Sequence, residues 1–239
     1  MKDRSIFTSL LSELELELTD YQLDQFDKYY ELLIEKNKVM NLTAITEYEE
    51  VIRKHFIDSL SIIKIFKTRE QISVLDMGTG AGFPGIPLKI VFPNYNITLL
   101  DSLNKRVNFL NEVITELKLE DICAVHGRAE EYVKKVEIRE SFDLVVSRAV
   151  AKLSILSEYC LPYVKLNGIF ISYKAGNVEE ELLTSAKAIS VLGGKTTGEE
   201  SFYLPDSDIQ RTLIMIKKMK QTPKQYPRGA GKPTKEPIQ

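Results

Sequence analysis

The chain contains few of the residues that build metal centres, disulfide frameworks or membrane segments. Its 239 residues include two cysteines, two histidines and no tryptophan. Cys123 and Cys160 lack the spacing of a metal or redox motif, so we expect both to be buried, reduced thiols. No apolar run approaches the ~20 residues that span a bilayer, and no continuous apolar stretch near the start indicates a secretory signal. We therefore expect a cytoplasmic protein that holds no metal.

A large excess of either charge is also absent. The formal net charge is −2, which by itself argues against non-specific binding to nucleic acid. The charges are unevenly placed, because residues 12–50 carry eleven acids and three bases whereas residues 217–235 carry seven bases and no acid. The basic end is rich in proline and glycine, so we expect an extended, mobile tail at 220–239. Such a tail either contacts phosphates or only keeps the protein soluble.

Composition and periodicity indicate one large domain with a helical lobe. The hydrophobic content of 44% is sufficient for a sizeable core. Residues 1–70 are predicted to be helical, with a capping box formed by Thr19 and Gln22. We expect this lobe to precede a main domain at 71–219 and the basic tail at 220–239.

The main domain is predicted to contain a mainly parallel β-sheet. Between residues 71 and 175, five apolar strands alternate with helical segments, and the fifth strand is Gly168–Tyr173. A helix is predicted at 177–192, and strand signals at 195–204 and 210–218 indicate a terminal hairpin-like pair. The sequence therefore predicts an α/β, Rossmann-like sheet with helices on both faces.

A glycine-rich turn follows the first of these strands, in Ser73-Val-Leu-Asp-Met-Gly-Thr-Gly-Ala-Gly-Phe-Pro-Gly85. The apolar run ends at Asp76, glycines stand at 78, 80, 82 and 85, and Pro84 and Pro87 suit the first turn of a helix. Glycines at alternate positions allow positive φ and let a ligand approach bare backbone. We therefore expect a nucleotide-like ligand at the carboxyl end of this strand.

The positions of the glycines relative to the end of the strand distinguish a dinucleotide site from an S-adenosylmethionine site. A dinucleotide fingerprint opens directly after the strand, yet counting from Gly78 gives Gly-x-Gly-x-x-Phe, which lacks the third glycine. The Asp-x-Gly-x-Gly-x-Gly pattern instead resembles motif I of class I S-adenosylmethionine-dependent methyltransferases. A nicotinamide oxidoreductase is therefore disfavoured, and an ordinary glycine-rich turn is the alternative without a ligand.

A second strand ends at Asp101, 23 residues after Gly78. That spacing is close to the ~20 residues at which an acid accepts hydrogen bonds from a ribose diol. The alternative is a helix-capping carboxylate, although Ser102 could provide the cap and leave Asp101 for the ligand. Lys105 and Arg106 follow in the first helical turn, as a solvated face or as contacts to substrate.

Two further strand ends supply the remaining candidates. Ala129 and Glu130 follow the third strand and could hold an adenine through backbone and edge contacts. Arg148 ends the fourth strand at the mouth of the crevice, where its guanidinium can fork onto a carboxylate or phosphate. The alternatives are an ion pair for Arg148 and a helix-dipole contact for Glu130.

Together with two upstream segments, these motifs resemble one family. The segments are Leu75-Asp-Met-Gly-Thr-Gly-Ala-Gly-Phe-Pro-Gly-Ile-Pro87, Leu100-Asp-Ser-Leu-Asn-Lys-Arg106, Ser147-Arg-Ala149, Met40-Asn-Leu-Thr-Ala-Ile-Thr46 and Lys54-His-Phe-Ile-Asp-Ser59. They are similar to the RsmG (GidB) family of bacterial 16S ribosomal RNA guanine-N7 methyltransferases, over roughly residues 20 to 220. The resemblance implies a class I methyltransferase fold, S-adenosylmethionine as cofactor, and methylation of the guanine at position 527 in the decoding-centre hairpin.

The resemblance and the motifs define the expected site. The resemblance places cofactor contacts on Gly78, Phe83, Ala129, Glu130 and Arg148. The full set of candidate cofactor-binding residues is Asp76, Gly78, Gly80, Gly82, Phe83, Asp101, Ser102, Ala129, Glu130 and Arg148. The candidate substrate-binding residues are Arg148, Lys174, Lys105 and Arg106.

The expected chemistry requires no catalytic acid or base. Guanine N7 carries an in-plane lone pair and no proton, so approach geometry and exclusion of water suffice. His55 is therefore expected to be structural and paired with Asp58, and His126 to have no special role. The expected partner is 16S ribosomal RNA or a small-subunit assembly intermediate, bound by a monomer. A methyltransferase of another substrate and an RNA-binding or nucleotide-binding module without turnover are the alternatives.

Overall fold

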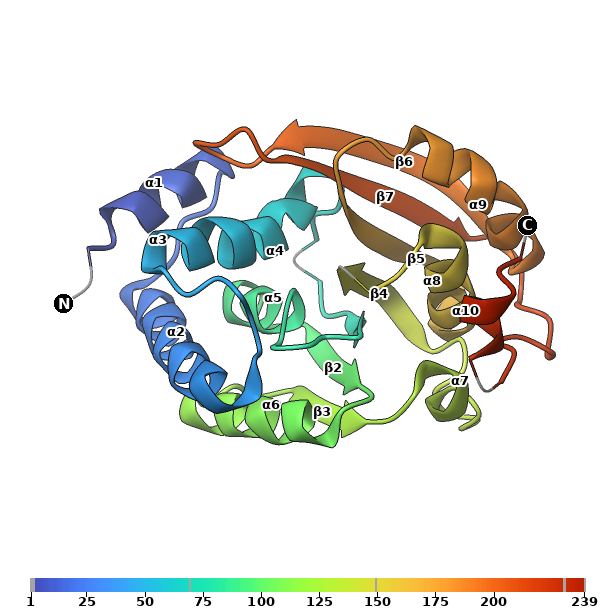
Figure 1. The fold of residues 1–239 in the computed structure, drawn as a ribbon, viewed down its shortest axis with the longest axis horizontal. Helices are drawn as coiled ribbons and strands as arrows, with labels where there is room; N and C mark the ends of the chain where they lie inside the picture. Colours follow the sequence, from blue (N-terminus) through green and yellow to red (C-terminus); the bar gives the residue numbers. More distant parts are fainter. Residues whose placement is uncertain (1–2, 69, 149, 230, 239) are drawn as a thin grey trace.

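A computed structural model describes residues 3–68, 70–148, 150–229 and 231–238 (Figure 1). Its centre is a seven-stranded sheet in the order β3-β2-β1-β4-β5-β7-β6. The first five strands in this order are parallel, and β7 pairs antiparallel with both β5 and β6, which confirms the predicted Rossmann-like sheet and its terminal hairpin. The strands are β1 Ser73–Met77, β2 Asn96–Asp101, β3 Ile122–His126, β4 Phe142–Arg148, β5 Val164–Ala175, β6 Gly194–Tyr203 and β7 Gln210–Lys218.

Helices cover both faces of this sheet (Figure 1). One face is covered by α1 Ser5–Glu13, α2 Asp20–Met40, α3 Tyr48–Val51, η1 Ile52–Ile57, α4 Asp58–Leu60, η2 Ser61–Lys64, α5 Gly85–Val91 and α6 Asn104–Glu116. The other elements are α7 Ala129–Tyr132, α8 Leu153–Cys160, η3 Leu161–Tyr163, α9 Glu179–Val191 and α10 Lys232–Lys235.

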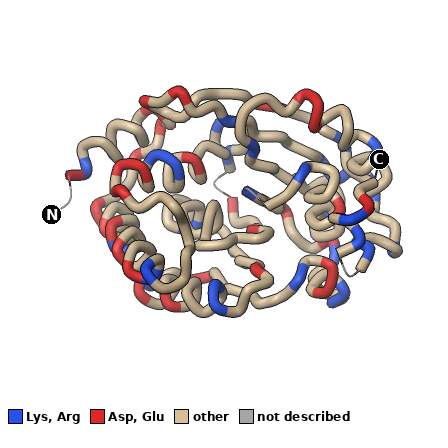
Figure 2. Tube along the Cα trace, viewed as in Figure 1, with Lys and Arg blue, Asp and Glu red and all other residues tan. Residues whose placement is uncertain are grey.

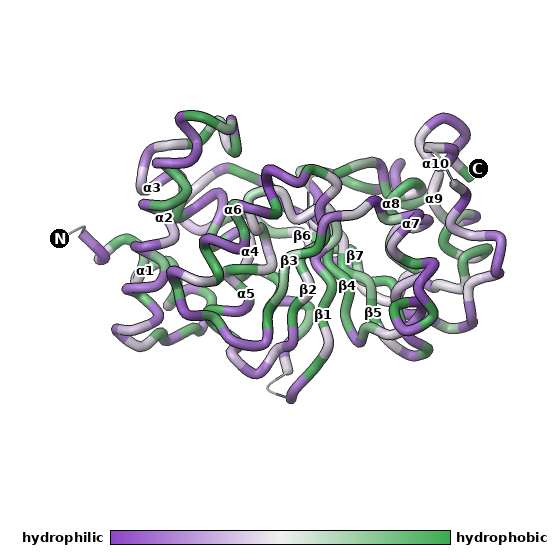
Figure 3. Tube along the Cα trace, turned by 90° about the horizontal axis from the view of Figure 1, so that it is seen from below, coloured by the Kyte–Doolittle hydropathy of each residue, from purple (hydrophilic) through white to green (hydrophobic). Residues whose placement is uncertain are grey.

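Two hydrophobic cores follow from the alternation of side chains along the strands. Val74 belongs to the core beneath the N-terminal helices, whereas the next residue, Leu75, belongs to the core beneath α8 and α9. Successive side chains of a strand point to opposite faces, so an apolar run buried on both sides supplies both cores. Figure 3 shows these strands as a hydrophobic centre between more hydrophilic outer segments.

The predicted helical lobe is helical and shares a core with the sheet. The predicted capping box is confirmed, because the side chains of Thr19 and Gln22 exchange hydrogen bonds with each other's backbone at the start of α2. Farther along α2, the hydroxyl of Tyr29 donates to the Ala81 carbonyl of the glycine loop at 2.6 Å. These contacts fix the lobe against the loop, whereas the domain boundaries at 70 and 219 remain predictions.

The C-terminal segment is not the extended, mobile tail that the sequence suggested. Arg228 forms an ion pair with the buried carboxylate of Glu158 at 2.7 Å, and Thr222 and Pro233 are also buried. The prediction is wrong because prolines and glycines do not prevent packing where basic and polar groups meet buried acceptors. Ala230 and Gln239 of this segment, like Ala149 after β4, lie outside the described residues.

The two cysteines differ in exposure. Cys160 is buried as expected, but Cys123 is exposed. The prediction for Cys123 is wrong because β3 is the edge strand of the described sheet, where side chains on the faces are covered less completely than on the central strands. None of the described helices is long and apolar enough to cross a membrane.

Candidate cofactor and substrate site

The glycine loop after β1 requires glycine at particular positions. Gly78, Gly80 and Gly82 have φ values of 70°, 62° and 106°, a region that L side chains rarely occupy. A Cβ atom at Gly78 would lie only 2.7 Å from Cγ2 of Val150, whereas one at Gly80 would meet nothing within 4 Å. Gly78 is therefore constrained by both backbone conformation and space.

Asp76 lies beneath this loop and is fully buried. Its Oδ2 accepts hydrogen bonds from the Thr79 hydroxyl at 2.7 Å and the Gly85 N–H at 2.8 Å, while Oδ1 has no partner among the described residues. Burial raises the pKa of Asp76 to about 6. The carboxyl group thus fixes the turn from β1 to α5, and it does not line the cavity described next.

A cavity of about 460 Å³ opens at the carboxyl ends of β1, β2 and β3. This is the crevice in which parallel α/β sheets bind their ligands. Six of the predicted residues lie in its lining: Gly78, Asp101, Ser102, Ala129, Glu130 and Arg106. Five predicted cofactor residues do not line it: Asp76, Gly80, Gly82, Phe83 and Arg148.

Asp101 holds two backbone segments of this cavity together. Its Oδ1 accepts from the Leu103 N–H at 2.9 Å, and its Oδ2 accepts from the Gly80 N–H at 3.0 Å. The helix α6 has Leu103 as its N-cap and no side-chain cap, so the suggested capping role of Ser102 is wrong. A carboxylate has about four acceptor positions, so Asp101 can still accept from a ligand hydroxyl.

The cavity carries balanced charge. Asp101 and Glu130 contribute carboxylates and Arg106 and Arg128 contribute guanidinium groups. Arg106 approaches the Asp101 carboxylate at 3.4 Å. A ligand that carries an amino group, a carboxylate and a ribose would find groups of both signs here.

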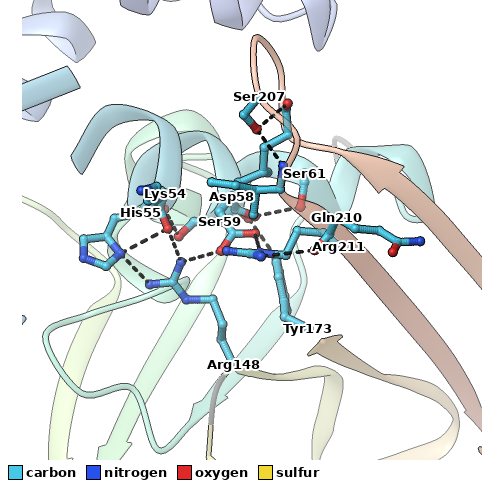
Figure 4. Close-up of polar contacts among 12 residues, drawn as sticks. Lys54, His55, Asp58, Ser59, Ser61, Arg148, Tyr173, Ser207, Gln210 and Arg211 are labelled. Carbon is cyan, nitrogen blue, oxygen red and sulfur yellow. Dashed lines mark hydrogen bonds and ion pairs between the residues drawn. The ribbon is translucent and has the colours of Figure 1, made fainter. Parts of the chain in front are cut away.

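Arg148 points away from this cavity, into a side-chain network under the N-terminal helices (Figure 4). Its Nη1 donates to Asp58 Oδ2 at 2.9 Å and to the Lys54 carbonyl at 3.1 Å. Asp58 is buried and also accepts from Arg211 Nε at 3.0 Å. The guanidinium of Arg148 lies over the Phe83 ring, 5.0 Å from its centroid. Phe83 and Arg148 thus form one stack beside the glycine loop.

His55 belongs to this network but does not pair with Asp58, as the sequence had suggested. Its Nδ1 lies 3.3 Å from Arg148 Nη2, and its Nε2 lies 2.8 Å from Thr43 Oγ1. Nδ1 also lies 3.1 Å from the Lys54 carbonyl oxygen, so the ring contacts the backbone of its own helix as well as Arg148. Burial and the neighbouring Arg148 lower the pKa of His55 to about 3. Asp58 is unavailable to His55 because two arginines occupy its oxygens.

A second cavity, of about 310 Å³, lies beside this network. Arg148, Lys174 and Arg211 are in its lining. Lys174 is held by the Ala151 carbonyl at 2.8 Å and the Glu181 carboxylate at 2.7 Å. Val150 lines the first cavity and Ala151 lines the second, so the segment after β4 borders both cavities.

The predicted substrate residues are therefore divided between two places. Arg148 and Lys174 share the second cavity, and Arg106 lines the first. Lys105 is exposed and lines neither cavity.

A larger cavity, of about 710 Å³, lies at the opposite end of the sheet and contains none of the predicted residues. It is lined by parts of the α1–α2 connection and by Asn94 and Tyr95, which precede β2. Because ligands of parallel sheets bind beyond the carboxyl ends of the strands, this cavity is not the candidate site.

The structure adds residues that the sequence did not identify. Arg128 lines the first cavity and could have been found, because it directly precedes Ala129. Tyr159 and Gly231 also line that cavity, but no local pattern connects either residue with the glycine loop. Asp58 was likewise missed as the partner of Arg148, and Arg211 as the second arginine on Asp58, because these pairs are far apart in sequence.

Comparison with known proteins identifies a family and relatives that carry the same name. Residues 22–209 match the family described as GidB, rRNA small subunit methyltransferase G. The chain is 59% identical to ribosomal RNA small subunit methyltransferase G of Lachnoclostridium phytofermentans over 100% of this chain and 98% of that protein. The protein of the same name from Desulforamulus reducens is 58% identical over 95% and 94% of the two chains.

Solved structures resemble this chain in fold. YcgJ from Bacillus subtilis superposes with a TM-score of 0.54 at 15% identity, over 70% of this chain and 100% of that one. TYW2 of M. jannaschii, solved in complex with AdoMet, has a TM-score of 0.54 at 18% identity, over 73% and 78% of the two chains.

Proposed function

The chain belongs to the rRNA small subunit methyltransferase G family, and we propose that it transfers a methyl group from S-adenosylmethionine to N7 of a guanine in 16S ribosomal RNA. The expected target is the guanine at position 527 of the decoding-centre hairpin. The observation that carries the proposal is the pair of cavities at the carboxyl ends of the strands, one charge-balanced and one cationic. They provide separate places for a methyl donor and a nucleotide, and the segment after β4 borders both.

The first cavity suits S-adenosylmethionine. The Asp101 carboxylate retains acceptor positions for the ribose diol, and the Gly78 backbone can be approached closely because it has no side chain. Ala129, whose carbonyl accepts the Tyr163 hydroxyl at 2.6 Å, and Glu130 hold a fixed edge for the adenine. When bound, the cofactor supplies a methyl group on a positively charged sulfur.

No residue of the chain needs to move a proton in this reaction, because guanine N7 has a free lone pair. The contribution of the chain is to position the base and exclude water. The neutral His55 and the stack of Arg148 on Phe83 are preorganised for that role, since their side chains are already fixed by hydrogen bonds and packing. We therefore assign no catalytic acid or base.

The second cavity is the proposed place for the target nucleotide. Arg148, Lys174 and Arg211 present positive charge there, and Arg148 also stacks on the Phe83 ring of the glycine loop. A guanine inside folded RNA would have to leave its stack to enter, at a cost of a few kcal/mol. Arg106 and the exposed Lys105 are proposed to contact flanking phosphates.

The same chemistry bears on the state in which the RNA substrate is bound. We propose that the enzyme acts as a monomer in the cytoplasm, on 16S ribosomal RNA or on a small-subunit assembly intermediate in which the hairpin is still accessible. Extrusion of the base is easier while the hairpin is not yet enclosed by proteins.

Mapping of 7-methylguanosine tests the proposal. Ribosomal RNA from cells with and without this protein should differ at one guanine of the decoding-centre hairpin. In vitro, labelled S-adenosylmethionine should transfer its methyl group to 16S RNA but not to a transcript with adenine at that position. Transfer to protein or to a small molecule in place of RNA would refute the assignment.

A further inference from the structure

The C-terminal segment reaches the cofactor cavity. Residues 219–229 and 231–238, here called the C-terminal strap, follow β7, pass α8 and include α10 (Figure 1). Gly231 of the strap lies in the lining of the cavity, together with Tyr159 of α8. The strap is therefore part of the site although it is more than 100 residues from the glycine loop in sequence.

The strap is anchored where it leaves the sheet. The ammonium group of Lys218 is fully buried and donates to the Leu161 carbonyl and to Thr222 Oγ1, at 2.5 and 2.6 Å. Thr222 donates its N–H to Glu140 at 2.7 Å, and Arg139 donates to the Thr222 carbonyl at 3.0 Å. This first anchor satisfies a buried cation, so it belongs to the stability of the domain.

A second anchor lies close to the cavity. Glu158 is 1% exposed, and its carboxylate accepts from the Nε, Nη2 and backbone N–H groups of Arg228 at 2.7 to 2.9 Å. A carboxylate and a guanidinium in this forked geometry form a strong, directional pair. We call this pair the latch. It lies next to the cavity, because Tyr159, the residue after Glu158, is in the cavity lining.

A third contact lies beyond Gly231 in the sequence. Tyr159 and Thr234 approach each other at 3.3 Å between their hydroxyl groups, and Pro233 is buried. Gly231 thus lies between the latch and this contact, with a φ of 72°. Lys232 and Lys235 beside it are exposed, and Figure 2 shows basic residues gathered around α10 and α7, in contrast to the acidic residues along α2.

We propose that the C-terminal strap is a wall of the S-adenosylmethionine site, held in place by the Arg228–Glu158 latch, and that Gly231 and Tyr159 are cofactor-binding residues. The inference rests on the proposed function only in the identity of the cofactor. Residues Asp101, Ala129 and Glu130 form the part of the site that the fold supplies, and the strap closes the side they leave open. Loss of the latch should therefore weaken cofactor binding without any change at the glycine loop.

The main experiment compares the parent with a full-chain variant in which Glu158→Gln and Arg228→Met are combined. Both charges are removed, so no unpaired charge remains buried. Calorimetry should show the Kd for S-adenosylhomocysteine rise about tenfold, and hydrogen exchange in residues 231–238 should become faster. In the parent, S-adenosylhomocysteine should slow exchange in the same residues.

A second pair of full-chain variants covers the case in which the double variant fails to fold. Gly231→Val forces a branched residue into a left-handed conformation, whereas Gly229→Ala introduces a side chain where φ is not positive and nothing lies within 4 Å. Gly231→Val should weaken binding several-fold and Gly229→Ala should match the parent.

These measurements need neither RNA nor turnover. Their outcomes therefore distinguish a failure of the strap proposal from a failure of the proposed function. An unchanged Kd in the folded double variant overturns the strap proposal, and so does an unchanged Kd in Gly231→Val. A parent protein that does not bind S-adenosylhomocysteine refutes the proposed function instead.

Discussion

The two cavities bordered by the segment after β4 are built in different ways. The cofactor cavity is formed largely by short loops that directly follow β1, β2 and β3, with charges of both signs. The cationic cavity depends on a network in which Asp58 contacts Arg148 and Arg211 from 90 and 153 residues away. Loop geometry therefore determines the first cavity, and long-range pairing of buried charges determines the second. Substitutions in the first should mainly alter ligand affinity, and substitutions in the second should also alter stability.

The largest expected effect is on stability, in the network. Asp58→Ala leaves Arg148 and Arg211, whose side chains are 13% and 20% exposed, without their shared carboxylate. Loss of one partner of a buried pair typically costs 3–5 kcal/mol, so we expect a loss of about 3 kcal/mol in the free energy of unfolding. Urea titration measures it. Lys134→Ala, which removes an exposed ion pair with Glu131, should cost less than ~0.5 kcal/mol. Similar losses in both variants would mean that the buried network contributes no more to stability than an exposed ion pair.

The next effect concerns affinity at the glycine loop. Gly78→Val places a branched side chain where a Cβ already meets Val150, and we expect cofactor binding to fall below detection. Gly80→Val is the matched control, because it has the same left-handed strain without that close contact. Both should lose roughly 1–2 kcal/mol of stability from the backbone conformation. Calorimetric binding by the Gly78 variant at the level of the Gly80 variant would contradict the predicted approach of the ligand.

A smaller effect is expected at Asp101, which combines a structural and a ligand role. Asp101→Asn keeps an acceptor for only one of the backbone N–H groups of Gly80 and Leu103, because these bond to different oxygens of the carboxylate. Loss of the charge should weaken S-adenosylmethionine binding by roughly 1–3 kcal/mol, the range for hydrogen bonds to charged groups. A 2′-deoxy analogue should lose less affinity in the variant than in the parent. Equal losses in both backgrounds would mean that Asp101 only organises the loop.

The smallest net effect is a pH dependence to which His55 and Asp76 contribute with opposite signs. The pKa of His55 is lowered to about 3, so between pH 3 and 6.5 the unfolded state binds more protons and stability rises with pH. The pKa of Asp76 is raised to about 6 from 3.8, so between these values the folded state binds more protons and stability falls as pH rises. Each contributes up to about 1 kcal/mol per pH unit. Between pH 4 and 6 the two should partly cancel in the parent.

Two variants separate these contributions. His55→Asn should make stability fall more steeply from pH 4 to 6, because only the Asp76 contribution remains. Asp76→Asn should make it rise more steeply over the same range. Denaturant titrations at several pH values measure both slopes, and parallel curves for the parent and His55→Asn would show that His55 does not titrate on unfolding.

Several parts of the site were predictable because they depend on neighbours in sequence. The capping box at Thr19, the turn at Gly78 and the positions of Asp101 and Ala129 each follow from a strand or helix end and the residues next to it. Parallel strands bring their carboxyl ends to one edge, so the ligand crevice followed from the order of elements. The sequence predicted that Arg148 contacts the cofactor. Its pairing with Asp58 could not be predicted, because the two residues are 90 positions apart in sequence.

The sequence by itself determined the class of sheet, the glycine turn and the acid that follows the second strand, because local backbone geometry and strand order specify them. Only the tertiary structure decided where Arg148 points, what His55 contacts and where the basic end of the chain lies. Those outcomes depend on which buried acceptor a long cationic side chain reaches. Asp58 takes Arg148 and Arg211, and Glu158 takes Arg228, because a buried carboxylate requires a partner wherever in the chain that partner stands.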